Sequence, residues 1–398
     1  MLTESLEFAP ERDAETFSAV PAASAVFLLR GHDAQAEPYV SKTANLRRRL
    51  QRLLGPVEER TRKLNLRHRV CSIEYTPTGS DFESGFVLYN ILRATFPKTY
   101  GNRLRFRFAP LVKLHLENEY PRASITTRVG RLNGRSLYYG PFPSRTAAEK
   151  FMNDSLDFFK MRRCVDDLHP DPKFPGCIYS EMKMCLAPCF KGCTDEEYSS
   201  EVGRVQAYFD SGGESLAREF SGQREAASGN LAFEEAAAIH SRLEKLKPVL
   251  GQLPEIVCRL DCFSALIIQP GRDHSGQTPE SVRFFRVVNG CIAEPVTFFI
   301  QATEHAKSQS MESRVQEALN ASPPLQKKSA IETMEHLALL KRWYYRSSRI
   351  GEIFLADQKG ALPMRRIVRG IGRVLRGEKP EQPALQGIRQ TAEGIPLG

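Results

Sequence analysis

Five of the nine cysteines lie between Cys164 and Cys193, and four of them follow the spacing Cys164-x12-Cys177-x7-Cys185-x3-Cys189. Thiolates are ligands of soft metal centres, and a reducing cytosol does not keep disulfides. This density therefore indicates a zinc site or an iron-sulfur cluster. The spacing alone does not choose between the two. Free thiols that pack as small apolar side chains are the alternative without a metal.

The residues around these cysteines resemble the cysteine-rich segment of the UvrC family, the subunit of bacterial nucleotide excision repair that cuts damaged DNA. The likeness is carried by Arg163-Cys164, Pro175-x-Cys177 and the run Cys185-Leu186-Ala187-Pro188-Cys189. The family places its iron-sulfur ligands at these positions. The resemblance therefore implies a four-iron cluster (4Fe-4S) held by Cys164, Cys177, Cys185 and Cys189, whereas Cys193 lies outside the pattern and is expected to be an ordinary thiol.

A chain of 398 residues exceeds the usual size of one domain, and 41% hydrophobic residues can fill several cores. The formal charge of +9 and the pI near 9.1 favour a polyanionic partner. The first residues are acidic and lack an apolar core segment, so no signal peptide is expected. The apolar runs are too short to cross a bilayer. We therefore expect a cytoplasmic protein.

Near the N-terminus, residues 24–40 read as two short strands joined by a Gly-His-Asp turn, which predicts a β-hairpin. Residues 41–55 follow as a helix, with leucines at helical spacing and arginines on the other faces. Lys42 lies at the expected helix entrance, where backbone N–H groups favour an anion. The predicted DNA-binding residues are Lys42, Arg47, Arg48, Arg49 and Arg52. A solvated basic helix face is the alternative.

This N-terminal arrangement resembles the GIY-YIG nuclease domain of the same family. The segments that follow, from 82 to 106 and from 131 to 159, are similar to that domain's last helix and to the strand and helix before the family's cysteines. The resemblance carries Phe27 and Tyr39 onto the two signature tyrosines and Ser41 onto the signature glycine. Lys42 and Arg49 keep the family's basic positions, so Tyr39 and Arg49 are the implied catalytic remnant. Leu88 falls at the metal-binding glutamate.

The leucine matters because a divalent cation beside the scissile phosphate is held by carboxylate oxygens. Glu83 is the nearest acid, but five positions along a helix turn it about 140° away from Leu88. Phe27 also lacks a hydroxyl, and Ser41 adds a Cβ where a close backbone approach was allowed. We expect this module to bind rather than cut. An alignment shift that places Glu83 at the metal remains the alternative.

After the cysteines, residues 214–250 predict two helices joined at Gly229-Asn230, with Pro248 closing the second. In the second helix an apolar stripe follows helical spacing, at Phe233, Ala236, Ala237, His240 and Leu243. An ordinary packed helix pair would also explain this pattern. The motif resembles the UVR motif, through which UvrC docks onto UvrB, with Phe233, Glu234, Ala236 and Ala237 at its core and His240 where an arginine is common. The resemblance implies a UvrB-type partner, with Phe233 as the anchor.

The C-terminal third predicts strands over 256–300 with a hairpin turn at Asn289-Gly290, a helix from about Ala330 and a strand over 351–355. It resembles the part of UvrC that leads into a ribonuclease-H-like nuclease, and the rest of that nuclease and a helix-hairpin-helix are expected to be missing. Asp261 is expected in a cap or turn, and surface roles are expected for His305 and His336. Cys258, Cys262 and Cys291 are expected to be buried strand thiols.

We therefore expect an α+β multidomain protein that resembles UvrC over about residues 22–357. The expected boundaries are 1–21 for an N-terminal extension, 22–108 for the GIY-YIG-like domain, 109–200 for the cysteine-rich connector, 201–250 for the UVR hairpin, 251–376 for a truncated ribonuclease-H-like α/β segment and 377–398 for a disordered tail.

Two functions follow from the resemblance. The first is a DNA-binding protein of nucleotide excision repair that is impaired or inactive as a nuclease and recruits, or competes for, a UvrB-type partner. The second is an active endonuclease that makes a single incision with Mg²⁺ or Mn²⁺. A structural iron-sulfur protein unconnected to DNA is a third possibility.

Overall fold

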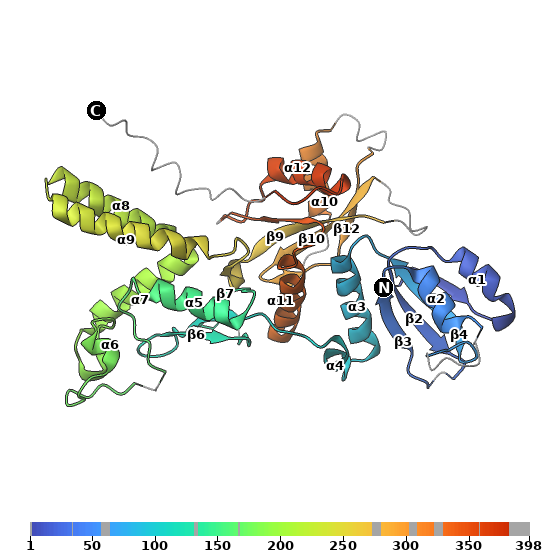
Figure 1. Cartoon of the computed structure of the whole chain (residues 1–398), viewed down its shortest axis with the longest axis horizontal. Coiled ribbons are helices and arrows are strands. Elements are labelled where there is room, and N and C mark those ends of the chain that lie inside the picture. The colour runs from blue at the N-terminus through green and yellow to red at the C-terminus, as the bar shows by residue number, and fades with distance from the viewer. Residues whose placement is uncertain are drawn as a thin grey trace.

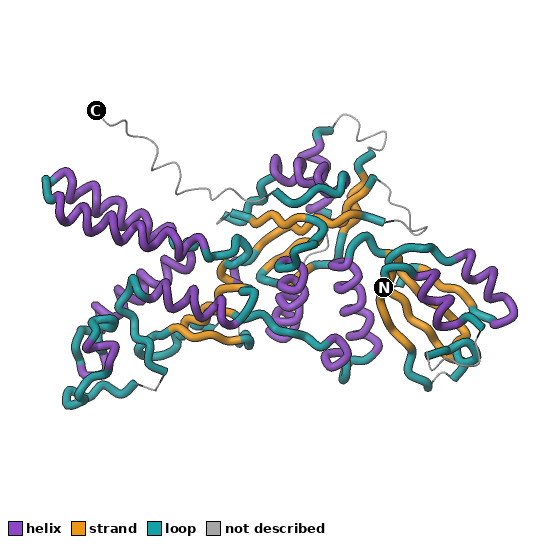
Figure 2. The backbone as a smooth tube through the Cα atoms, in the orientation of Figure 1, coloured by secondary structure: helices purple, strands orange, loops and turns teal. Residues whose placement is uncertain are grey.

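The computed structural model describes residues 2–33, 35–56, 64–130, 134–165, 168–272, 280–301, 309–321, 329–357 and 359–381. Within these ranges the strands form three sheets in which every pairing is antiparallel, and helices accompany each sheet (Figure 1, Figure 2). The expected α+β class is confirmed. His305, and the expected disordered tail from residue 382 onward, lie outside the described residues.

The N-terminal sheet has the strand order β1-β4-β2-β3. Its strands are β1 (Glu4–Glu7), β2 (Ala25–Gly31), β3 (Tyr39–Thr43) and β4 (Val70–Pro77). The predicted hairpin is β2 with β3, in a register that pairs Phe27 with Ser41. Because β1 pairs with β4, the expected boundary after residue 21 falls inside this unit. A short turn, η1 (Pro10–Arg12), and helix α1 (Asp13–Ala19) also precede that boundary.

The helix predicted over residues 41–55 is present as α2 (Leu46–Leu54), and it covers one face of this sheet. It begins where the Asn45 side chain accepts the Arg48 N–H, and its four leucines are buried against Phe27 and Leu29. Helix α3 (Asp81–Thr95) lies on the opposite face, where Val87 and Leu88 pack against Val26 and Leu28. Successive residues of β2 thus point to different layers.

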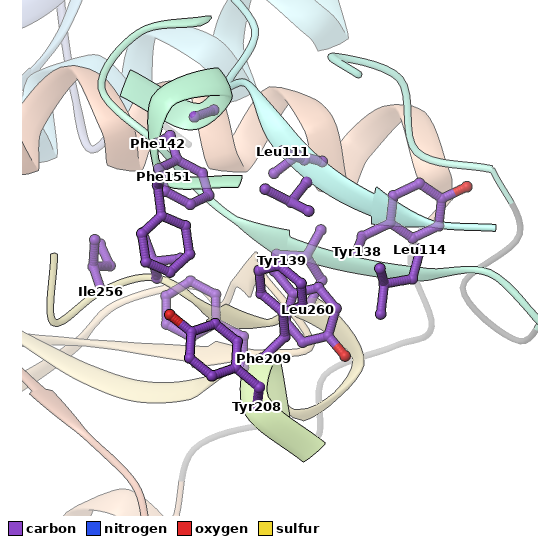
Figure 3. Close-up of a cluster of buried hydrophobic side chains, with 14 of the residues drawn as sticks. Leu111, Leu114, Tyr138, Tyr139, Phe142, Phe151, Tyr208, Phe209, Ile256 and Leu260 are labelled. Carbon is purple, nitrogen blue, oxygen red and sulfur yellow. The ribbon is translucent and has the colours of Figure 1, made fainter. Parts of the chain in front are cut away.

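The middle sheet has the order β6-β5-β7-β8 and supports the cysteine segment. Its strands are β5 (Leu111–Leu114), β6 (Ala123–Thr126), β7 (Leu137–Gly140) and β8 (Cys258–Arg259). Helix α5 (Arg145–Leu156) begins at the Ser144 cap and packs on this sheet. Figure 3 shows Phe151, Tyr139 and Phe209 meeting Ile256 and Leu260 in one core. Strand β8, which follows the predicted helical hairpin of residues 214–250, therefore completes a sheet whose other three strands precede that hairpin.

The cysteine segment contains two short helical turns, α6 (Ile178–Glu181) and η2 (Pro188–Phe190), and leads into α7 (Asp195–Asp210). Helices α8 (Glu214–Gly229) and α9 (Phe233–Gly251) then form the predicted hairpin, which projects from the molecule (Figure 1). Pro248 does not close α9 as expected. It removes one helical N–H, but burial of Leu246 and Val249 holds the helix together past it.

The C-terminal sheet has the order β11-β10-β9-β13, with β12 also paired to β10. Its strands are β9 (Ser264–Pro270), β10 (Ser281–Val288), β11 (Cys291–Ile292), β12 (Val296–Phe299) and β13 (Glu352–Leu355). The predicted turn at Asn289-Gly290 is confirmed: both residues have positive φ, and they join β10 to β11. Asp261 lies in a turn, η3 (Leu260–Cys262), as expected.

Three helices accompany this sheet: α10 (Met311–Asn320), α11 (Ala330–Tyr344) and α12 (Met364–Leu375). Helix α12 was not predicted. It packs Ile367 and Ile371 on one sheet face, and Gly370 permits its close approach, since a Cβ there would lie 2.3 Å from Phe354 Cζ.

Helix α3 joins the N-terminal and C-terminal sheets. On the side away from Leu88, its Phe82 and Phe86 rings lie 5.1 and 5.8 Å from the ring of Phe285 on β10. Tyr89 donates a hydrogen bond to Glu335 on α11, and α3 and α11 stand side by side in Figure 1. A short helix, α4 (Tyr100–Leu104), follows α3. Helix α3 therefore packs against both the N-terminal and the C-terminal sheet.

Candidate functional site

The four cysteines of the predicted cluster lie around α6 and η2, and none of them is in a disulfide. Two of their sulfurs accept N–H groups: Cys164 Sγ lies 3.4 Å from Arg162 Nη1, and Cys185 Sγ lies 3.3 Å from the Ala187 nitrogen. Arg162 is buried, with its Nε donating to the Tyr120 carbonyl. N–H groups that point at these sulfurs could also donate to the thiolates of a bound metal centre.

The four thiols are close enough for their charges to act on one another. Burial first, and then the charges of Cys164, Cys189 and Cys177, raise the pKa of Cys185 to about 11, although the Ala187 N–H opposes this rise. Four sulfurs that repel one another when ionised are a donor set suited to a soft cation. Across the described ranges, no three Cys, His, Asp or Glu side chains are placed to hold one metal ion as they stand. The cluster, and the choice between iron and zinc, stay predictions.

The other cysteines have different surroundings. Cys193 packs against the main core, as expected for an ordinary thiol. Cys258 packs against that core from β8, and Cys291 is buried on β11 of another sheet. Cys262 is exposed rather than buried, with its sulfur 3.0 Å from Arg259 Nη2, because it lies in the turn η3 and not in a strand.

Tyr39 and Arg49 are brought together on the α2 face of the N-terminal sheet. Arg49 Nη2 donates to Tyr39 Oη at 2.8 Å, and the Tyr39 and Phe27 rings lie 6.1 Å apart. Arg49 Nε is buried and has no hydrogen-bond partner among the described residues. In the same ranges, no carboxylate is hydrogen-bonded or ion-paired with either side chain. The pair can bind an oxyanion but does not hold a hard cation.

Leu88 and Glu83 lie away from that pair. Leu88 joins the apolar layer of Val26 and Leu28, on the sheet face opposite Phe27. Glu83 is buried at 2% exposure; its Oε2 accepts the Gly79 N–H at 2.7 Å, and its Oε1 lies 3.2 Å from Arg283 Nε on β10. Burial raises the pKa of Glu83, and Arg283 opposes that rise. The acid nearest in sequence to Leu88 is therefore directed into the C-terminal sheet.

The predicted DNA-binding residues differ in how far they are engaged. Arg47 donates to the carbonyls of Val20 and Ser18, so it fastens α2 to the preceding chain. Lys42 is not at a helix entrance: it lies in β3, on the α3 side of the sheet, and ion-pairs with Asp81 at the start of α3. Arg48 and Arg52 are exposed.

Arg346, which lies just after α11, donates a second hydrogen bond to Asp81, with 2.5 Å between Nη1 and Oδ2. Sequence reasoning missed this partner because it is far away along the chain. The only local signal was that Asp81 opens a helix after the Ser80 cap.

The hairpin exposes its expected anchor. Phe233 is 64% exposed at the start of α9, and Glu234 and Ala237 are exposed beside it, whereas Ala236 is half-buried. The face of α9 that packs inward carries Ile239, Leu246 and Val249 instead. Large apolar side chains on a protruding turn are typical of a protein-binding surface.

His336 does not take the expected surface role. It is fully buried on α11, where its Nδ1 accepts the Ile292 N–H at 2.9 Å and its ring packs edge to face on Tyr89. The reason is that α11 packs on α3, which could not be read from the isolated histidine. Within the described residues, no helix is both long and apolar enough to cross a membrane.

Comparison with known proteins connects these features to one family. Residues 110–208 match the family model "UvrC/Cho excinuclease, middle domain", which spans β5 to α7 and includes the cysteine segment. UvrABC system protein C of Rickettsia bellii is 26% identical over 275 residues, which cover 69% of this chain and 41% of that protein. The same protein of Carboxydothermus hydrogenoformans is 30% identical over 216 residues, covering 54% and 35%.

No solved structure matches the chain. The chain spans about two fifths or less of the length of these relatives. The family model covers the cysteine segment and three strands of its supporting sheet, β5, β6 and β7. The chain is therefore related to the UvrC family of excinucleases and contains that family's middle domain.

Proposed function

We propose that this chain is a DNA-binding protein of nucleotide excision repair that does not cut through its N-terminal module. The observation that carries the proposal is the separation of Leu88 and Glu83 from the Tyr39–Arg49 pair. Metal-dependent incision of a phosphodiester needs a cation held by carboxylate oxygens beside the phosphate. Tyr39 and Arg49 on the α2 face supply a phenol and a guanidinium, which can bind phosphate but do not hold a divalent cation.

The fold assignments within this proposal are a GIY-YIG-like N-terminal module and a truncated ribonuclease-H-like C-terminal segment. The first is supported by the β2–β3 hairpin followed directly by α2. The second rests on the sequence resemblance alone; the residues concerned form an antiparallel sheet accompanied by α10, α11 and α12.

The four cysteines would hold the proposed iron-sulfur cluster. The bound cluster would supply a soft, positively charged centre that cross-links the segment between α5 and α7. The chain's own residues provide the surroundings: Arg162 and the Ala187 N–H contact two of the sulfurs, and α7 begins just after Cys193. This arrangement supports a structural role for the segment.

The hairpin is proposed to dock onto a UvrB-type partner through Phe233, Glu234, Ala236 and Ala237. The exposure of Phe233 supports this role, because an aromatic ring that stays in water in the free protein gains free energy when a partner covers it. The inward face of α9 is already occupied, so a partner would contact the outer face and the tip.

A nicking assay tests the proposal. Purified protein would be incubated with ultraviolet-damaged supercoiled DNA and Mg²⁺ or Mn²⁺, beside the Arg49→Ala variant. We expect both proteins to bind the DNA and neither to nick it above background. Nicking by the unaltered protein that disappears in Arg49→Ala would overturn the proposal and favour the active endonuclease, for which the retained Tyr39–Arg49 contact is the supporting observation.

A further inference from the structure

Asp81 lies at the surface where the N-terminal module meets the C-terminal part of the chain. Lys42 Nζ on β3 donates to Asp81 Oδ1, and Arg346 Nη1 donates to Asp81 Oδ2 at 2.5 Å. The side chains of Asp81 and Arg346 are 53% and 51% exposed, so solvent reaches both. One carboxylate is thus shared by cations from two distant segments.

Arg342, near the end of α11, adds to this cluster. It is exposed in the last turn of α11, four residues before Arg346, and its charge acts on Asp81 together with those of Lys42 and Arg346. Partial burial raises the pKa of Asp81, but the three cations outweigh burial and leave the pKa below its usual value. Asp81 is therefore ionised at neutral pH. Three cations and one carboxylate leave a local excess of positive charge.

A purely structural role explains this cluster incompletely. Cations near the end of α11 complement its helix dipole, and Asp81 suits the start of α3. These effects do not require Lys42 to reach the same carboxylate from β3. Ion pairs between half-exposed groups contribute only about 0–1 kcal/mol, so they exchange readily with another anion. In contrast, Arg47 is committed to two backbone carbonyls.

We propose that Lys42, Arg342 and Arg346 form a binding site for the phosphates of a DNA backbone, which Asp81 occupies as an internal counter-anion in the free protein. This inference rests on the proposed DNA-binding function and adds a contact outside the Tyr39–Arg49 pair. The site spans two parts of the molecule, so bound DNA would run across their junction at α3. The carboxylate weakens binding, since a phosphate must share or displace its partners.

Fluorescence anisotropy with a short labelled DNA duplex, repeated over a series of salt concentrations, tests the site. We expect Asp81→Asn to bind several-fold more tightly than the unaltered protein, with a steeper salt dependence. The double variant Arg342→Gln/Arg346→Gln should bind about 10-fold more weakly, with the log–log salt slope reduced by about two. Glu149→Gln on α5 makes the same charge change as Asp81→Asn at another exposed ion pair and should stay within about twofold.

The matched variant Arg342→Lys/Arg346→Lys keeps the charges and should retain most of the salt slope, which separates phosphate binding from a loss of folding. If Asp81→Asn and the double glutamine variant both keep the slope of the unaltered protein, this site is overturned while DNA binding stands. An unaltered protein whose binding does not depend on salt would overturn the proposed DNA-binding function, and this site with it.

Discussion

Between Cys164 and Cys189 all four cysteines of the predicted ligand set are present. In the N-terminal module, by contrast, Tyr39 and Arg49 contact each other, and no carboxylate is bound to either in the described residues. Both regions lie on well-packed supports, the middle sheet and the β2–β3 hairpin with α2. The difference is therefore in the chemistry of a few side chains and not in the quality of the fold. A scaffold can be retained for binding after its reactive groups have been replaced.

The contrast between the two regions depends most on whether the four cysteines bind a metal centre. Cys185→Ser should remove the visible absorption expected at about 400 nm for thiolate-bound iron, together with the bound iron, and should destabilise the protein by about 3 kcal/mol or more. Cys193→Ser is the matched control and should keep both. Metal analysis and thermal unfolding measure the two effects. Equal behaviour of the two variants would remove the cluster from the proposal.

For the N-terminal module, the contrast depends on Leu88 being a packing residue and not a position in a metal site. Leu88→Glu places a charge in the apolar layer with Val26 and Leu28, so it should cost about 2 kcal/mol and restore no nicking. Leu88→Met keeps the volume and should cost less than about 1 kcal/mol. Urea unfolding and the nicking assay give the two readouts. A gain of metal-dependent nicking in Leu88→Glu would place the glutamate at a working metal site after all.

The hairpin provides a test of retained binding. Phe233→Ala should weaken association with a UvrB-type partner by about 10-fold to 100-fold, because an exposed aromatic anchor is lost. Its thermal stability should change little, since the ring is mostly in water. Phe299→Ala, at a comparably exposed ring on β12, is the control and should leave the affinity unchanged. Titration calorimetry measures the effect, and equal affinities for the two variants would exclude Phe233 as the anchor.

The smallest expected effect concerns Glu83 as a structural acid. Because burial raises its folded-state pKa above the unfolded value of 4.5, the folded protein holds the extra proton between these two values. Glu83 therefore contributes stability that falls as pH rises through that window, and Glu83→Gln should remove this dependence. Denaturant unfolding of both proteins from acid to neutral pH measures it. An unchanged pH profile in the variant would mean that the pKa is not raised.

Local patterns predicted the elements well where they also decide the packing. The leucines of α2, the Asn289-Gly290 turn and the two helices at Gly229 all formed as expected, because periodicity and turn geometry act over a few residues. The predictions for Pro248 as a helix end and His336 as a surface residue were wrong because neither depends on neighbouring residues alone. Their surroundings are set by a core and by a helix, α3, that lie elsewhere in the sequence.

The candidate sites follow the same division. The four cysteines of the predicted cluster and the exposed Phe233 could be singled out from spacing and motif. The partners of Glu83 and Asp81 could not, because Arg283 and Arg346 reach them from the distant C-terminal sheet and the end of α11. Helix α12 was not predicted, although Ile367, Ile371 and Val374 already follow helical spacing in the sequence.

Strand β8, which comes after the hairpin, pairs with β7, which comes before it. The hairpin of α8 and α9 is thus connected to the middle sheet at both of its ends, and not at one end through a flexible linker. A protein bound to the tip of this hairpin near Phe233 would stay at a nearly constant distance from the cysteine segment. Its effective concentration there would be set by a rigid arm rather than by the random reach of a loose linker.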